Sequence, residues 1–347
     1  MAKKAKTQAP KPISLALQGG GAHGALTWGV LDRMAVSKKV DVKAIAATSA
    51  GAMNAVAYAA GMAKGGPRGA QAGLEAFWHE VSRRSAPYSK LRTPDVLKPL
   101  FPWSPFNLMS AMTAIASPYD LNPFDLNPLR DAVEAAIDFD AVRNSGIDLH
   151  LTATNVETGR ARVFTGDEIN IDAVLASACL PQTFKAVEID GTPYWDGGYM
   201  GNPSLFPLIY SDAPKDILLV MLNPLSRAGV PKTASAIQER LNEINFNSSL
   251  LGELRAIGFV QRLLEGNMLS ENAKQEYRQL FLHIIRGGAA MCDLALESKY
   301  DTDESFLEDL RERGAGLADK WLSNCVEDVG IQSTLDIRTE FLEGAAL

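Results

Sequence analysis

Along the first two thirds of the chain, short apolar runs alternate with segments whose apolar residues recur every three or four positions. The short runs predict buried strands at residues 13–17, 42–46, 147–154 and 216–222. The periodic segments predict helices at residues 25–36, 52–60, 129–137 and 171–178. Strands that alternate with helices in this way predict a layered α/β core with a mainly parallel sheet.

Two regions depart from this alternation. Residues 88–128 interleave prolines with Phe101, Trp103, Phe106, Leu108 and Met109, and prolines at that density exclude a continuous helix. After Pro231 the pattern is mainly helical, with one strand-like run at 281–285. We therefore expect a disordered basic tail (1–12), a core (13–225) that carries an insertion (88–128), and a mainly helical extension packed on that core (226–347).

Charge and composition indicate which partners and which cellular location are expected. The net charge of -7 in 347 residues argues against nucleic acid, because phosphate binding needs a basic face. The three cysteines, Cys179, Cys292 and Cys325, show no disulfide or metal-ligand spacing. No segment has the pattern of a signal peptide or a membrane span. These features predict a cytoplasmic protein whose contact with membranes, if any, is peripheral.

Three motifs carry candidate chemistry, and each follows an apolar, strand-like run. The chain reads Gly19-Gly20-Gly21-Ala22-His23-Gly24, then Thr48-Ser49-Ala50-Gly51, then Asp196-Gly197-Gly198. The carboxyl ends of parallel strands share one edge of a sheet, so the first two motifs are expected to meet there. The glycine loop offers backbone amides for an oxyanion hole, Ser49 a nucleophile and Asp196 a base.

Two of these motifs have an alternative interpretation. The glycine spacing also matches a dinucleotide-binding loop, which needs an acidic residue at the end of the second strand. The nearest acid, Asp41, precedes that strand, so the cofactor interpretation is disfavoured. Ser49 alone could be a helix N-cap. The proximity of the glycine loop favours the nucleophile.

The base for Ser49 is either a histidine or a carboxylate. His79 lies in a helical stretch and His150 in a strand, so both are expected to be structural. His283 follows Ser49 and Asp196 in the chain order of a hydrolase triad, but it sits in the middle of a strand. Asp196 is the better candidate, provided that burial raises its pKa from about 4.

These motifs resemble those of the patatin-like phospholipases, which join a G-G-G-x-x-G loop, a G-x-S-x-G serine and a D-G-G/A aspartate. The resemblance covers roughly residues 13–222 and includes the segments around Asn155, Ser177 and Asn202. It implies a three-layer α/β/α fold and hydrolysis of lipid acyl esters without a metal or cofactor. It further implies a Ser49–Asp196 dyad and an oxyanion loop, supported by neighbouring residues. The loop residues are Gly19, Gly20, Gly21 and Ala22, and the supporting residues are Gly51, Gly197, Gly198 and His23.

The chain departs from the family pattern at two positions. Ala47 replaces the first glycine of the serine motif, which could strain the turn and lower activity. His23 stands where many members have Arg or Lys, either as a tolerated surface substitution or as a donor that orients the loop. The alternatives are a catalytically degenerate lipid-binding protein of the same fold and a Ser49–Asp196–His283 triad. The residues 88–128 are expected either to cap a lipid site or to pack as core or a homodimer contact.

Overall fold

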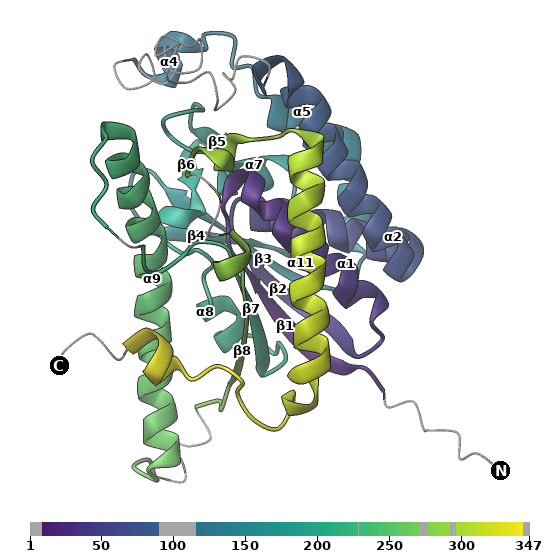
Figure 1. Cartoon of the computed structure of the whole chain (residues 1–347), viewed down its shortest axis with the longest axis vertical. Helices are drawn as coiled ribbons and strands as arrows, with labels where there is room; N and C mark the ends of the chain where they lie inside the picture. The colour runs from purple at the N-terminus through teal and green to yellow at the C-terminus, as the bar shows by residue number, and fades with distance from the viewer. Residues whose placement is uncertain are drawn as a thin grey trace.

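The computed structural model describes residues 9–89, 116–227, 229–270, 272, 277–291, 294 and 296–342. The chain alternates strands and helices as the pattern predicts (Figure 1). Of the expected disordered tail (1–12), residues 1–8 lie outside the described residues, but Lys11 and Pro12 belong to the first strand, so the expectation is wrong for them. The apolar residues singled out at 101–109 fall within 90–115, which also lies outside the described residues.

One mixed, mostly parallel sheet organises the molecule. Its strands pair in the order β5-β6-β3-β2-β1-β7-β8, and β4 pairs with β3. Strands β2, β1, β7 and β8 are parallel, whereas β4, β5 and β6 make antiparallel pairs. The strands are β1 (Lys11–Leu17), β2 (Val40–Ala47), β3 (Asp148–Asn155), β4 (Ala161–Thr165), β5 (Val187–Ile189), β6 (Thr192–Asp196), β7 (Asp216–Met221) and β8 (Phe281–Arg286).

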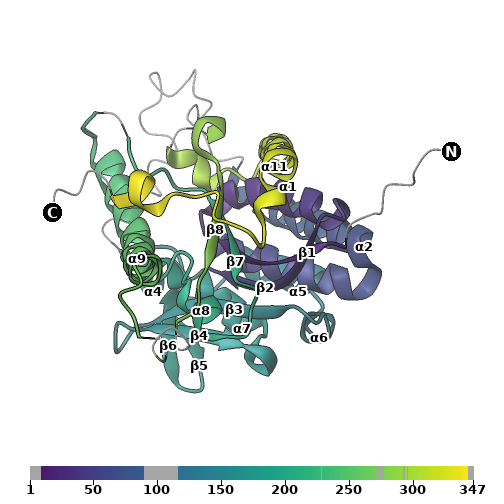
Figure 2. The same cartoon turned by 90° about the horizontal axis from the view of Figure 1, so that it is seen from below.

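Helices cover both faces of this sheet, which confirms the three-layer α/β/α architecture. The longer ones are α1 (Gly24–Val36), α2 (Ala50–Ser89, kinked at Gly65 and Gly66), α9 (Ala234–Glu265) and α11 (Glu304–Asn324). The shorter ones are α4 (Pro118–Leu121), α5 (Pro128–Ala136), α6 (Phe139–Arg143), α7 (Ile171–Ser177) and α8 (Phe206–Tyr210). Figure 2 shows α9 on the opposite side of the sheet from α1 and α2.

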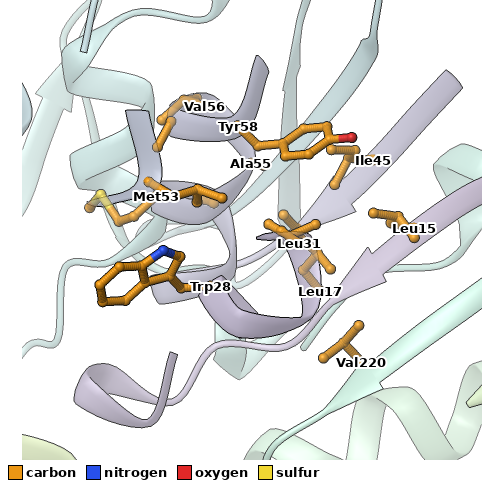
Figure 3. Close-up of a cluster of buried hydrophobic side chains, with 14 of the residues drawn as sticks. Leu15, Leu17, Trp28, Leu31, Ile45, Met53, Ala55, Val56, Tyr58 and Val220 are labelled. Carbon is orange, nitrogen blue, oxygen red and sulfur yellow. The ribbon is translucent and has the colours of Figure 1, made fainter. Parts of the chain in front are cut away.

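The two faces of the central strands bury different side chains, as the two-residue period of a strand requires. Leu15, Leu17 and Ile45 point into the larger apolar cluster, with Trp28 and Leu31 of α1 (Figure 3). The intervening small residues of the same strands, such as Ala16 and Ala46, face the second cluster, where α8 and α9 pack.

The region after residue 225 joins this core through both a strand and a helix. Strand β8 pairs with β7 in parallel, from Phe281 opposite Asp216 to Arg286 opposite Met221. Helix α11 packs along α1, where a Cβ added to Gly314 would lie 2.0 Å from the carbonyl oxygen of Leu26. Within the described ranges, no helix is both long and apolar enough to cross a membrane.

Candidate active site

Ser49 lies on a tight turn between β2 and α2. Its φ of 55° is in the left-handed region, which is uncommon for a residue with a side chain. The Ser49 amide donates to Oγ of Ser177 (3.0 Å), and that hydroxyl donates to the carbonyl oxygen of Thr152 (2.7 Å). Ala47, which departs from the family pattern, pairs regularly within β2. The residue with the left-handed conformation is Ser49, not Ala47.

Glycines let the glycine loop and the serine turn lie in direct contact. A Cβ added to Gly19 would be 2.6 Å from Cβ of Ser49, and one added to Gly24 would be 2.7 Å from Cβ of Ala50. A Cβ at Gly51 would approach the carbonyl oxygen of Leu17 to 2.4 Å. These separations are too short for any side chain. The two motifs therefore require glycine at these positions for a packing reason.

Asp196 ends β6 and is fully buried. Its Oδ1 accepts the amide of Gly198 (2.7 Å), whereas Oδ2 has no hydrogen-bond partner among the described residues. Burial raises the pKa of Asp196 to about 7, against the lowering effects of the Gly198 amide and the Ser49 side chain. A carboxyl group with this pKa can exchange a proton near neutral pH.

Strand register brings Asp196 beside the serine turn. β4 pairs with His150 to Thr154 along one edge of β3, so β2 and β6 both occupy the other edge. There Ala47 at the end of β2 is opposite Leu151, and Asp196 is opposite Ala153. The carboxylate therefore follows directly beyond the end of β2, where the chain turns at Ser49.

The glycine loop follows β1 and keeps three amides that donate to no described group. The amide of Gly19 donates to Oδ1 of Asn202 (2.6 Å), so its N–H is already used. The amides of Gly20, Gly21 and Ala22 donate to no described group. They precede α1 in a short 3-10 turn (Gly21–His23), where a helix N-terminus favours negative charge. Of the four predicted loop residues, these three remain available to an oxyanion.

His23 is buried and neutral. Burial, with the nearby charges of Lys299 and Arg227, lowers the pKa of His23 from 6.5 to about 3. Its Nε2 lies 2.7 Å from Oγ of Ser298. It is therefore not the surface substitution that one interpretation of the sequence expected.

The structure does not bring His283 to the serine. Its Nε2 lies 3.1 Å from Oδ1 of Asp216 and its Nδ1 lies 2.9 Å from Oγ1 of Thr334. Asp216 begins β7, at the opposite end of the sheet from Ser49. The alternative Ser49–Asp196–His283 triad is therefore wrong for this conformation. His79 pairs with Glu304 on the surface and His150 with Asp148.

Sequence reasoning did not assign roles to the polar residues that hold these motifs together. Asn202 binds both backbone groups of Gly19, and Oγ1 of Thr48 donates to the carbonyl oxygen of Gly201 (2.7 Å). Oγ1 of Thr154 donates to the carbonyl oxygen of Asp196 (2.8 Å). Thr48, Thr154 and Asn202 stand in segments that carried the family resemblance, but their partners lie far away along the chain.

Comparison with known proteins supports the family that the motifs resemble. A family model described as patatin-like phospholipase matches residues 15–209. No curated protein matches the chain.

The solved structures that match include proteins from two bacteria. VipD from Legionella pneumophila is 14% identical with a TM-score of 0.38, over 90% of this chain and 67% of that chain. The ExoU–SpcU complex of the type III secretion system of Pseudomonas aeruginosa is 16% identical with a TM-score of 0.35. That match covers 91% of this chain, which spans about half (53%) of the other. Because the family model matches more than half of the chain, the chain belongs to the patatin-like phospholipase family.

Proposed function

We propose that this protein is a lipid acyl hydrolase in which Ser49 is the nucleophile and Asp196 the only general base. The observation that carries the proposal is Asp196 itself. It is fully buried beside the serine turn, one carboxylate oxygen lacks a partner among the described residues, and burial raises its pKa to about 7. Buried polar atoms are seldom left without a partner in native structures, so this oxygen marks a candidate functional group.

In the first half of the reaction, Asp196 takes the proton of the Ser49 hydroxyl as Oγ attacks the ester carbonyl carbon. The carbonyl oxygen becomes an oxyanion, to which the amides of Gly20, Gly21 and Ala22 donate. When the C–O bond breaks, the protonated Asp196 returns the proton to the leaving alcohol, and the acyl group remains on Ser49.

In the second half, Asp196 takes a proton from water, which attacks the acyl carbon. Collapse of the second oxyanion releases the fatty acid, and the proton returns to Ser49. Asp196 acts as base and acid in turn, which a pKa near 7 permits at neutral pH.

Exposed apolar side chains near this edge support a lipid substrate. Phe124 is 85% exposed and Leu126 is 62% exposed in the segment around α4, which lies above β5 and β6 in Figure 1. That segment is fastened beside the site: the amide of Ala186 donates to Oη of Tyr119 (3.2 Å), and Nζ of Lys185 donates to the carbonyl oxygen of Pro123 (3.2 Å).

The proposal is tested with Ser49→Ala and a fluorophosphonate probe. We expect the purified protein to hydrolyse a p-nitrophenyl ester and to take up one probe on Ser49. Ser49→Ala should lose both. Ser177→Ala is the comparison variant. It removes a hydroxyl that accepts the Ser49 amide but that is not the proposed nucleophile. Turnover that survives in Ser49→Ala, or an inactive wild type that binds lipid, would overturn the proposal, and the second result would favour the degenerate lipid-binding alternative.

A further inference from the structure

A short C-terminal segment lies directly on the glycine loop. The 3-10 turn η5 (Leu296–Tyr300) places the carbonyl oxygen of Lys299 2.5 Å from where a Cβ would stand on Gly21. Next to it, Oγ of Ser298 lies 2.7 Å from Nε2 of His23, and both side chains are buried. One side of the loop is therefore contacted by residues outside the segment that the family model matches.

A second connection runs from the Lys299 side chain to the loop backbone through Asn223. Nζ of Lys299 donates to Oδ1 of Asn223 (2.8 Å), and Nδ2 of Asn223 donates to the carbonyl oxygen of Gly19 (3.0 Å). Asn223 is only 2% exposed. The ammonium group of Lys299 also lies 3.7 Å from Oε1 of Glu243, a buried carboxylate that Arg227 binds through two nitrogens.

The direction of the Gly19 carbonyl determines the direction of the Gly20 N–H, because the peptide unit is planar. The carbonyl of Gly19 and the N–H of Gly20 belong to one planar trans peptide unit, so they point in opposite directions. Asn223 and Asn202 both donate to that oxygen. Their bonds therefore set the direction of the Gly20 N–H, one of the amides available to the oxyanion. Glycines on their own would leave this peptide free to rotate.

We propose that Lys299, Asn223 and Ser298 are positioning residues of the oxyanion hole. Lys299 orients the Asn223 amide, which aims the Gly20 N–H, while Ser298 holds His23 and with it the start of α1. This inference rests on the proposed function of the loop. It assigns to the C-terminal region a role in positioning the oxyanion donors rather than a purely structural one.

The test compares Lys299→Met and Ser298→Ala with Lys320→Met and Ser323→Ala. The two control residues lie on α11, exposed and away from the loop. For each variant, kcat and KM are measured on a soluble p-nitrophenyl ester, with kcat divided by the number of sites that a fluorophosphonate titrates. Thermal unfolding is recorded alongside.

We expect kcat per titrated site to fall about tenfold or more in Lys299→Met and Ser298→Ala, with KM little changed, because misplaced donors weaken the transition state alone. The controls should match the wild type. His23→Gln, which can still reach Ser298, should keep more activity than His23→Leu. Adding Ser298→Ala to His23→Leu should lower kcat little further, because both changes remove the same contact, that between His23 and Ser298.

Two results would overturn the inference. One is that kcat per titrated site in Lys299→Met and Ser298→Ala equals that of the controls. The other is that activity falls only in step with the number of titrated sites or the unfolding temperature, as a purely structural role would produce. Neither result depends on whether Ser49→Ala is inactive, so failure of this inference is distinguishable from failure of the proposed function.

Discussion

Two buried aspartates at opposite ends of the same sheet are held in contrasting ways. Asp216, at the start of β7, has its Oδ1 bonded to both Nε2 of His283 (3.1 Å) and the amide of Gly330 (2.7 Å). Asp196, at the end of β6, accepts one backbone amide, and its Oδ2 has no partner among the described residues.

The contrast separates a structural carboxylate from a chemically available one. A buried polar group without a partner costs free energy, and native structures retain few of them. His283, which would make a conventional base, stabilises Asp216 instead, so the proposed mechanism assigns proton transfer to Asp196 alone. Judged by residue type alone, His283 paired with Asp216 would be a more conventional base than Asp196.

The largest effect should come from Asp196→Asn. The amide keeps the shape of the side chain but takes no proton, so kcat should fall by about a thousandfold or more if Asp196 is the only base. Activity is measured on a soluble ester, and folding by circular dichroism. Asp212→Asn, an exposed aspartate, is the matched control and should retain full activity. An active, folded Asp196→Asn enzyme would remove the aspartate from the mechanism.

His283→Ala should lower stability rather than activity. The change removes one of the two hydrogen bonds to Asp216 and the contact with Thr334, and it leaves a cavity beside Trp321. Together these losses should cost about 3 kcal/mol in the free energy of unfolding. Urea titration measures that loss. His79→Ala removes only a surface ion pair with Glu304 and should cost less than about 1 kcal/mol.

The turnover of folded His283→Ala should equal that of the wild type. A variant that folds normally but is inactive would instead restore the triad and contradict the comparison between the two aspartates.

The pH dependence of activity should follow the raised pKa of Asp196. Because the base must be ionised, kcat/KM should fall about tenfold for each pH unit below about 7 and level off above it. A limb near pH 4 instead would mean that the base is a solvated carboxylate.

Stability should change with pH in the opposite direction. Between the unfolded pKa of 3.8 and the folded value of about 7, the folded state holds a proton that the unfolded chain releases. Rising pH therefore destabilises the wild type across this window. Asp196→Asn has no such proton, so the wild type should lose stability relative to it from pH 4 to pH 7. The comparison is made by urea unfolding of both proteins at each pH.

Much of the fold could be predicted from the sequence because its signals are local. Apolar runs and helical periodicity located β1, β2, β3, β7 and α1 to within a few residues. The strand-like run expected before Asp196 is β6, but its bounds could not be given from the sequence, because Thr192-Pro193-Tyr194-Trp195-Asp196 is short and only partly apolar. Its place beyond the end of β2 depends on pairing with β3, which no local pattern contains.

The candidate site divides in the same way. Ser49, Asp196 and the glycine loop stand in motifs, so the sequence identified them. The groups that hold the site depend on pairs that are far apart in the chain, such as Asn223 with Gly19 and Ser298 with His23. A single sequence carries no signal for such pairs. Burial of His23 also could not be predicted, because a histidine in a glycine loop is compatible with exposure.

The smallest expected effect concerns the exposed apolar residues beside the site. Phe124 is 85% exposed, so Phe124→Asp should leave folding and the hydrolysis of a soluble short-chain ester unchanged. Hydrolysis of long-chain lipid in vesicles should fall by about threefold to tenfold, because contact with the lipid surface would lose one apolar anchor and gain a charge.

Ile331→Asp is the control, since Ile331 is 68% exposed but follows Gly330 beside Asp216, at the opposite end of the sheet. If only the end that carries Asp196 meets lipid, vesicle activity should respond to Phe124→Asp and not to Ile331→Asp. Equal losses in the two variants would mean that added charge, rather than position, lowers vesicle activity. Loss of both soluble-ester and vesicle activity in Phe124→Asp would instead assign that segment a packing role.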